Sequence, residues 1–472
     1  MQQLFGTDGI RGTTNDQASP DEVRLTPELA LRIGRVLGDY ATERRSSGAS
    51  PLVVMGRDTR ISGVMLEAAL SAGLLAQGVD VIQLGVVPTP AVAYLVRRTN
   101  AQLGIAISAS HNPVDDNGIK VFEDTGYKLQ DDTASLLESR IVDAGYTIAL
   151  QSTAKLGRLL PGDALVRSYA EDLVADFPGR TDLSGKKVVL ECANGAASSI
   201  APEVFRSLGA EVVVLNGEPD GLNINESYEY VEPISLANQV VKRKADFGVA
   251  FDGDADRVIV VDEDGHIYDG DEILSIIAHS MKQSGKLTNN GVVTTNMSNL
   301  GLKIGLRQIG VDVVETPVGD KYVLAAMLER GYTLGGERAG HVIVLDGKRT
   351  TGDAIFLAVW IATELANVPD GKLSSFRSLI RRFPQFIGSA AIPPSKPPLG
   401  AVSGVAEAIE GIREALGSET DVNVRYSGTE NKVRLSIRTS RETDEDLVTH
   451  VGKNALDAIA GRIRAVAVEP GT

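Results

Sequence analysis

Ser110 stands in a segment whose residue types suit a nucleophile. The residues before it, 104–107, are small and apolar and predict a short core strand, whereas Pro113 and the turn residues beyond it end that strand. We therefore expect Ser110 to be presented in a turn rather than buried, as a candidate nucleophile with His111 and Lys120 near it in the sequence. The alternative is a Ser/Asn/Pro loop that only caps a helix.

Asp252, Asp254 and Asp256 place carboxylates at alternate positions of one tight loop. Such a concentration of like charge costs free energy unless a divalent cation neutralises it. A calcium loop ending at Glu263 fits the spacing in part, but Arg257 occupies the position where that loop needs glycine. Because so few carboxylates leave coordination positions open, as Mg2+ requires when it binds a substrate phosphate, we predict a Mg2+ site. An acidic turn without metal is the alternative.

Two other loops have the composition of phosphate or ligand sites. The first lies between two predicted strands near the C-terminus and combines hydroxyls, a glycine and guanidinium groups, which is how proteins bind phosphate. Its residues are Arg425, Ser427, Gly428 and Thr429, with Arg434 beyond. The second, residues 6–12, is rich in glycine, so its backbone can approach a ligand, and its strong cation is Arg11. Plain turns are the alternative for both loops.

A serine, a Mg2+ site and phosphate-binding arginines together indicate phosphoryl transfer through a phosphoserine. The cation and Arg257 would neutralise the phosphoryl oxygens, while either Lys120 or His341 would carry the proton of a sugar hydroxyl. The sequence has no P-loop and no kinase signature, so the expected donor is a phosphate on Ser110 rather than ATP.

Strands and helices must position these residues, and a repeated sequence pattern predicts such strands and helices. A strand, a helix and a second strand follow one another in residues 51–82, 187–214 and 291–314, with a glycine where each helix ends. Such βαβ elements build mainly parallel sheets covered by helices. We therefore infer three related α/β domains in tandem.

A further strand follows each repeat, at residues 103–107, 247–251 and 332–336. Directly after these strands come the Ser110 loop, the aspartate loop and the segment Glu337-Arg-Ala-Gly-His341. Since ligands bind at the carboxyl ends of strands in α/β sheets, we expect the three loops to meet in one composite site.

The last part of the chain has a different pattern. Residues 384–398 are rich in proline and predict a strand or linker, which we expect to act as the hinge of a movable lid. Beyond them, a helix over 402–416, strands over 422–426 and 432–438 and a helix over 445–466 predict a small α+β domain.

The composition is that of an ordinary globular protein of 472 residues, 43% hydrophobic and 23% charged, long enough for three or four domains. The formal net charge of -15 argues against nucleic acid or an anionic membrane as a partner. The single cysteine, Cys192, excludes an intrachain disulfide and suits the cytoplasm, and the few scattered histidines argue against zinc. Residues 1–8 lack the basic start of a signal peptide, and no apolar run has the length of a membrane span.

Four of these loops resemble the signature loops of the α-D-phosphohexomutase family, in the family's order and over nearly the whole chain. They are Ser-Ala-Ser-His-Asn-Pro113 with Asp116-Asn-Gly-Ile-Lys120, Asp252-Gly-Asp-Ala-Asp-Arg257, Gly335-Gly-Glu-Arg-Ala-Gly-His341 and Arg425-Tyr-Ser-Gly-Thr429. The resemblance implies four domains around a central cleft and a sugar bisphosphate as the activating intermediate. It also implies a phosphoserine at Ser110, one Mg2+ on that phosphate and on the three aspartates, sugar recognition by the Glu337 loop and phosphate binding by the Arg425 loop.

Four domains are predicted, at residues 1–155, 156–256, 257–372 and 373–472. The resemblance implies that the substrate is a hexose or hexosamine phosphate. The N-terminal glycine-rich loop and the doubled glycine before Glu337 are most similar to the amino-sugar branch of the family. Three departures leave the sugar open between glucosamine, glucose and mannose phosphates: Ala339 replaces the usual serine, residues 226–231 differ from the branch, and Asn431 replaces proline. A sensor that binds sugar phosphates without turnover is the alternative of another class. The oligomeric state, monomer or homodimer, stays open.

Overall fold

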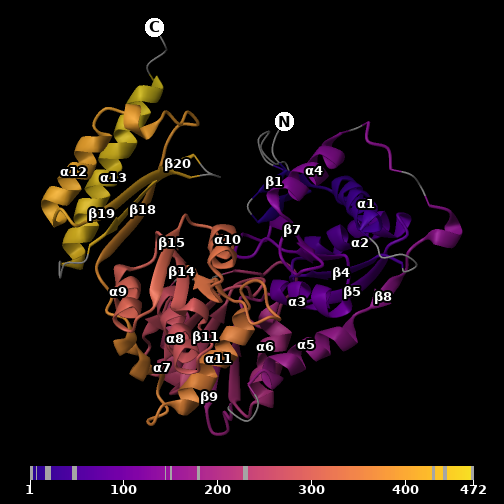
Figure 1. Ribbon diagram of the computed structural model, residues 1–472, viewed down its shortest axis with the longest axis horizontal. Helices are drawn as coiled ribbons and strands as arrows, with labels where there is room; N and C mark the ends of the chain where they lie inside the picture. Colours follow the sequence, from indigo (N-terminus) through magenta and orange to yellow (C-terminus); the bar gives the residue numbers. More distant parts are fainter. Residues whose placement is uncertain are drawn as a thin grey trace. The chain divides into compact units, whose positions relative to one another are not determined.

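The computed structural model divides the chain into two compact units (Figure 1). It describes residues 4–6, 8–15, 23–44, 50–143, 145–148, 151–177, 181–226, 232–427, 431–439 and 444–468. The first unit contains residues 1–295 and 314–377, and the second contains residues 296–313 and 378–472. Among the helices of the described residues, none combines the length and the apolar character that a membrane crossing needs.

The first sheet of unit 1 has a parallel half and an antiparallel half. Its strands are β1 (Phe5–Gly6), β2 (Gly9–Thr14), β3 (Arg24–Leu25), β4 (Leu52–Arg57), β5 (Asp80–Val86), β6 (Leu103–Ile107), β7 (Asp116–Glu123) and β8 (Leu159–Pro161). They lie in the order β1-β2-β7-β6-β4-β5-β8, with β3 beside β2. From β6 to β8 the neighbours are parallel, whereas from β6 to β1 they are antiparallel.

Helices cover this sheet, and two of them cross unusually closely. The helices are α1 (Pro27–Glu43), α2 (Ile61–Ala76), α3 (Thr89–Thr99) and α4 (Asp131–Val142). Helix α1 begins at Pro27 because the Thr26 side chain accepts a hydrogen bond from the Leu29 amide. A side chain at Gly34 would lie 2.3 Å from the Leu70 carbonyl oxygen, and one at Gly73 would lie 2.4 Å from that of Leu31. The crossing of α1 and α2 therefore requires glycine at both positions.

The second sheet repeats this plan with fewer strands. Its strands are β9 (Lys187–Glu191), β10 (Glu211–Leu215), β11 (Phe247–Phe251), β12 (Val258–Asp262) and β13 (Ile267–Tyr268), and the accompanying helices are α5 (Asp163–Ala175), α6 (Ala197–Ser207) and α7 (Ile234–Arg243). The order is β10-β9-β11-β12-β13. The pairs on the β10 side of β11 are parallel, and those on the β13 side are antiparallel.

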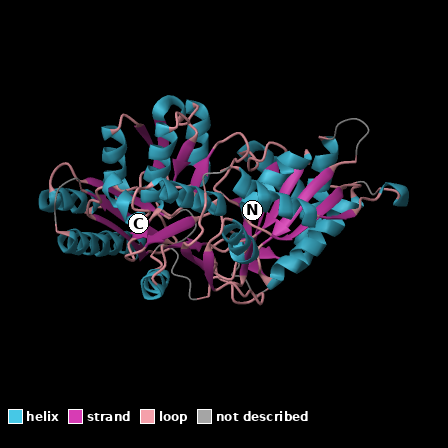
Figure 2. Cartoon of the chain, turned by 90° about the horizontal axis from the view of Figure 1, so that it is seen from below, coloured by secondary structure: helices cyan, strands magenta, loops and turns pink. Residues whose placement is uncertain are grey.

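The third sheet repeats the plan again. Its strands are β14 (Gly291–Thr295), β15 (Asp312–Thr316), β16 (Leu334–Gly336) and β17 (Val342–Val344), and its helices include α8 (Gly270–Gln283), α10 (Asp320–Arg330) and α11 (Ala354–Asn367). The order is β15-β14-β16-β17, with β16 parallel to β14 and antiparallel to β17. Figure 2 shows the helices in cyan around the magenta strands of these sheets.

One strand of each sheet marks the change from parallel to antiparallel pairing. These strands are β6, β11 and β16, and each continues through a loop into its antiparallel neighbour β7, β12 or β17. The three loops are the ones that carry the polar residues singled out in the sequence. Each repeat therefore presents its functional loop from the equivalent strand end.

Unit 2 contains a three-stranded antiparallel sheet with helices packed on it. Its elements are β18 (Gln385–Ala391), β19 (Asp421–Tyr426), β20 (Lys432–Arg438), α9 (Leu300–Gln308), α12 (Val405–Leu416) and α13 (Glu445–Val468). The strand order is β18-β20-β19. One core joins strand residues such as Leu435 and Ile437 to helix residues such as Ile412 and Ile459.

The predicted fold class, three tandem α/β domains followed by a smaller α+β region, is confirmed. The sheets are mixed, because each repeat adds an antiparallel hairpin to its parallel half. The sequence of the repeats predicts helices over residues 65–77 and 201–208, whereas α2 begins four residues earlier, at Ile61, and α6 four residues earlier, at Ala197.

The predicted hinge at 384–398 is wrong in position. Residues 385–391 form β18, which pairs with β20 along its length inside unit 2. The boundary falls earlier, between Arg377 and Ser378. On the unit 1 side, Arg377 donates two hydrogen bonds, of 2.7 and 2.8 Å, to the buried carboxylate of Asp262.

Candidate active site

Ser110 lies in the loop that joins β6 to β7, and it is buried rather than presented to solvent. Only 1% of the residue is exposed, so the expectation of a presented serine is wrong. Its backbone adopts a left-handed conformation with φ of 52°, which is uncommon for a non-glycine residue and frequent at functional sites. Its hydroxyl donates a hydrogen bond of 2.6 Å to Oδ2 of Asp252. The side chain is therefore directed at the aspartate loop, which covers it.

Arg60 and Asn225 hold the backbone of the Ser110 loop. Arg60 is fully buried and donates hydrogen bonds to the carbonyl oxygens of Ser110 (3.0 Å), Asn112 (2.8 Å) and Pro113. Asn225 donates to the carbonyl oxygens of Ser110 (2.9 Å) and Asn112 (3.0 Å). Neither residue was identified from the sequence, although an arginine in a run of turn residues directly before a helix was a weak signal.

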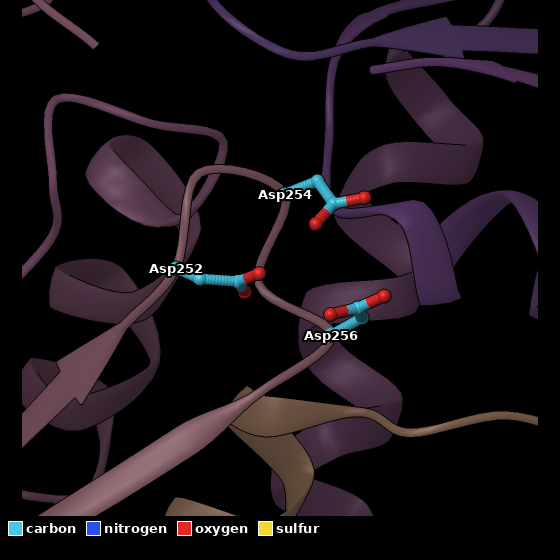
Figure 3. Close-up of side chains that lie close together, drawn as sticks. All are labelled: Asp252, Asp254 and Asp256. Atoms are coloured by element: carbon cyan, nitrogen blue, oxygen red, sulfur yellow. The ribbon is translucent and has the colours of Figure 1, made fainter. Parts of the chain in front are cut away.

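The three aspartates of the loop between β11 and β12 face a common point (Figure 3). One carboxylate oxygen from each of Asp252, Asp254 and Asp256 lies within 4.8 Å of the others, and all three residues are buried. The turn contains Ala255 with φ of 54°, a second left-handed non-glycine residue. Thr89 joins this loop to the start of α3, since its hydroxyl donates a hydrogen bond of 2.6 Å to Asp254.

The aspartate loop fits a divalent cation. Among the described residues, Oδ1 of Asp254 is buried without a hydrogen-bond donor, which is costly unless a cation supplies the missing interaction. Burial, together with the charges of Asp256 and Asp254, raises the pKa of Asp252 well above its ordinary value. An oxygen-only set of ligands is the kind that Mg2+ and Ca2+ prefer. The loop is therefore a group of carboxylates that could hold a metal ion, as its sequence predicted.

Lys120, on strand β7, is the buried cation beside these carboxylates. Its ammonium lies 2.7 Å from Asp254, 3.4 Å from Asp256 and 3.3 Å from Asp8. Burial opposes its charge, but Asp254, Asp8 and Asp256 raise its pKa well above the ordinary value. Lys120 therefore contacts the same aspartate loop to which the Ser110 hydroxyl donates its hydrogen bond.

Arg257, His111 and Arg11 surround the other side of the Ser110 loop. Arg257 donates a hydrogen bond of 3.1 Å to Nδ1 of His111, which lies 3.4 Å from the Ser110 hydroxyl. Burial, Arg257 and Arg11 lower the pKa of His111 to about 4, so its imidazole is neutral near pH 7. Arg11 donates to the side chain of Asn112 (3.2 Å) and pairs with Asp8 (2.5 Å). The expected cations therefore gather around Ser110.

His341 and Glu337 lie in the loop between β16 and β17, and His341 reaches the aspartates. His341 is 3% exposed, with Nδ1 at 3.7 Å from Asp256 and Nε2 at 3.9 Å from Asp320. Glu337 accepts a hydrogen bond of 3.0 Å from the amide of Gly319 at the start of α10. Ala339 is half-buried in the same turn. The three predicted loops thus contribute to one region of unit 1.

The predicted phosphate-binding residues form a separate cluster in unit 2. Arg425 and Arg434 are directly opposite each other on β19 and β20, and both line a cavity of about 280 Å³ on the sheet. Burial and the neighbouring Arg434 lower the pKa of Arg425. Like charges placed opposite each other destabilise a sheet, and an anion between them would relieve that repulsion. Ser427 lies 3.4 Å from Arg434, whereas Gly428 and Thr429 lie outside the described residues, as do residues 227–231.

Comparison with known proteins identifies the family. Three models of the phosphoglucomutase/phosphomannomutase family match the chain: α/β/α domain I at residues 2–146, domain II at residues 167–265 and domain III at residues 269–383. The chain belongs to this family. Its members are phosphohexomutases, so the chain is an isomerase of carbohydrate metabolism.

Individual relatives agree with this assignment. Phosphoglucosamine mutase of Pelotomaculum thermopropionicum is 46% identical over 440 residues, 92% of this chain and 94% of the relative. Phosphoglucosamine mutase of Syntrophus aciditrophicus is 43% identical over 446 residues, 94% of this chain and 96% of the relative. The crystal structure of a phosphoglucomutase/phosphomannomutase family protein from Burkholderia thailandensis superposes with a TM-score of 0.76 at 24% identity, covering 100% of this chain and 99% of that one.

Proposed function

We propose that this isomerase interconverts glucosamine 6-phosphate and glucosamine 1-phosphate through a phosphoserine at Ser110 and a bisphosphorylated sugar, as a step toward UDP-N-acetylglucosamine. One observation above all supports the mechanism: the Ser110 hydroxyl donates a hydrogen bond of 2.6 Å to Asp252, a member of the carboxylate cluster. The relatives named phosphoglucosamine mutase, at 43% and 46% identity over nearly the whole chain, support the amino sugar.

The reaction consists of two transfers of a phosphoryl group. In the first, a sugar hydroxyl oxygen bonds to the phosphorus of phosphoserine while the bond from phosphorus to Ser110 Oγ breaks. One group of the site takes the proton of the sugar hydroxyl and another returns a proton to Ser110 Oγ, and Lys120 and His341 are the candidates for these two roles. In the second, Ser110 Oγ gives its proton to the site and bonds to the phosphorus at the other end of the bisphosphate. The bond from that phosphorus to the sugar oxygen breaks, and the sugar oxygen takes up a proton, which releases the isomeric monophosphate. The phosphoserine is thereby restored, and the net reaction is an isomerisation.

The residues of this chain supply the electrostatics of the transfers. Asp252, Asp254 and Asp256, with the phosphate on Ser110, would hold one Mg2+, and this ion would neutralise charge on the phosphoryl oxygens. Arg257 and Arg11 place guanidinium groups beside Ser110, where they stabilise negative charge in the transition state. His111, as a neutral imidazole, orients Arg257.

Binding of the sugar uses two further groups in this proposal. Glu337, with Ala339 in the same loop, recognises the sugar hydroxyls. Arg425, Ser427 and Arg434, with Gly428 and Thr429, bind the phosphate that is not reacting. Because the bisphosphate must present each end to Ser110 in turn, one phosphate site serves both orientations. We also propose a cytoplasmic enzyme, and the four-domain division with boundaries after residues 155, 256 and 372 stays a prediction.

Three substrates test the choice of sugar. The purified protein should turn over glucosamine 6-phosphate with a higher kcat/KM than glucose 6-phosphate or mannose 6-phosphate. A clear preference for either neutral hexose would replace the proposal with a phosphoglucomutase or phosphomannomutase. Ala339 is the observation that favours this alternative, because alanine lacks the hydroxyl that the usual serine would direct at the sugar.

Ser110→Ala tests the covalent mechanism. Removal of a covalent nucleophile leaves only residual catalysis, so turnover should fall a thousandfold or more. Mass spectrometry of the active parent should place one phosphate on Ser110. A parent enzyme that stays unphosphorylated during turnover would refute the mechanism, and sugar-phosphate binding with no isomerisation would identify a sensor.

A further inference from the structure

A closed ring of charged side chains joins the candidate proton carriers to a lysine that the mechanism does not use. In order around the ring, the members are Lys120, Asp8, Lys128, Asp320, His341 and Asp256, which is again next to Lys120. Acidic residues separate the basic ones throughout. Lys120 and His341 flank Asp256, each between two carboxylates, and Lys128 lies across the ring from Asp256.

Lys128 contacts two members of the ring, the carboxylates of Asp8 and Asp320. It follows β7, its side chain is 20% exposed, and its ammonium lies 2.6 Å from Asp320 and in contact with Asp8. Burial opposes its charge, but Asp320 and Asp8 raise its pKa above the ordinary value, so it is cationic near neutral pH. It also lines a cavity of about 470 Å³, so we expect small reagents to reach a cysteine placed at this position.

Loss of this ammonium would change what its neighbours contact. Asp8 and Asp320 would lose their shared cation and face each other as like charges. Besides Arg11, which pairs with Asp8 at 2.5 Å, the remaining basic groups of the ring are Lys120 for Asp8, at 3.3 Å, and His341 for Asp320, at 3.9 Å. Both basic groups would therefore be drawn away from Asp254 and Asp256 and from the reacting phosphate.

We propose that Lys128 is a positioning residue for phosphoryl transfer, which acts through Asp8 and Asp320 to hold Lys120 and His341 at the aspartate loop. This inference rests on the proposed function, because it concerns the geometry of the same reaction. A positioning role differs from substrate binding in its kinetics: kcat falls, and KM stays close to that of the parent.

Lys128→Met removes the charge and keeps the length of the side chain. Displacement of reacting groups by about 1 Å can cost about a hundredfold in rate, so kcat should fall about 10- to 100-fold with KM changed less than about threefold. The control is Lys321→Met. Lys321 lines the same cavity and pairs at 3.5 Å with the exposed Asp131, outside the ring, and its variant should keep kcat within about twofold.

A chemical rescue separates the charge of Lys128 from its contribution to the fold. Cys192 is the only cysteine of the sequence and is fully buried, so alkylation of folded Lys128→Cys should modify position 128 alone. Bromoethylamine converts that cysteine to a side chain with an ammonium nearly where lysine has it, and kcat should recover at least about tenfold. Iodoacetamide, which adds a neutral amide, should not restore it. The treated parent is the second control.

Each result decides the inference. An unchanged kcat in Lys128→Met, a rise in KM alone, or an aminoethylated Lys128→Cys as slow as the untreated variant would overturn it. If Lys128→Met does not fold, Lys128→Gln gives the same kinetic comparison. A parent that isomerises none of the sugar phosphates would refute the proposed function, whereas an active parent with equally active Lys128 variants would refute only the positioning role.

Discussion

Arg60 offers the sharpest test of how the Ser110 loop is held. Its guanidinium is fully buried, pairs at 3.0 Å with Asp58, which is also buried, and donates hydrogen bonds to three carbonyl groups of the loop. Arg60→Met leaves the Asp58 charge buried without its partner. Breaking a buried ion pair in this way costs about 3–5 kcal/mol, and we expect a loss of unfolding free energy in that range. Asn225 still donates to two of the carbonyls, which limits the further loss.

The pH dependence of this loss has a definite sign. Burial raises the pKa of Asp58 in the folded parent, although Arg60 and the Ser108 hydroxyl oppose the rise. Without Arg60 the pKa rises further. An acid whose folded pKa exceeds its unfolded pKa destabilises the fold above the folded pKa, and this cost disappears as the pH falls to the unfolded pKa of about 4. The deficit of Arg60→Met should therefore grow as the pH rises above about 4.

Urea unfolding across this pH range, together with kcat, measures both effects. The double variant Asp58→Asn/Arg60→Met removes the stranded charge, so it should recover part of the stability and lose the added pH dependence. The control is Arg98→Met, since Arg98 is 45% exposed and its pair with Asp172 should contribute less than about 1 kcal/mol. A change below about 1 kcal/mol in Arg60→Met, or a double variant no more stable than the single one, would refute the reasoning.

Three more predictions concern other parts of the chain. Arg425→Ala should raise KM for both the 1-phosphate and the 6-phosphate, because the phosphate cluster of unit 2 serves both orientations; a defect in one reaction direction alone would contradict a shared site. Treatment with EDTA should abolish turnover and Mg2+ should restore it, and full activity in EDTA would exclude the metal from the mechanism. Burial raises the pKa of the Cys192 thiol, so a disulfide reagent should modify it only after unfolding, and prompt reaction of the native protein would show that the site is open.

The sequence was sufficient for the elements and for the order of the functional loops. Hydrophobic periodicity, glycines at helix ends and turn residues are local signals, and they placed the three repeats and the α+β region within a few residues of the observed bounds. The polar residues after β6, β11 and β16 could be recognised as one site because the carboxyl ends of strands are where α/β sheets bind ligands.

The tertiary structure alone decided which side chains meet. Ser110 bonds to Asp252 across 142 residues of sequence and Lys120 bonds to Asp254 across 134, and no local pattern encodes either pair. Three features arise only when three separate sheets pack their loops together. They are the burial of Ser110, the hydrogen bonds from Arg60 and Asn225 to its loop, and the ring of charged side chains through Lys128. The type of a residue determines which chemistry its side chain can perform. Its partners depend on segments brought close by burial of apolar surface elsewhere in the fold, and that information exists only in the packed chain.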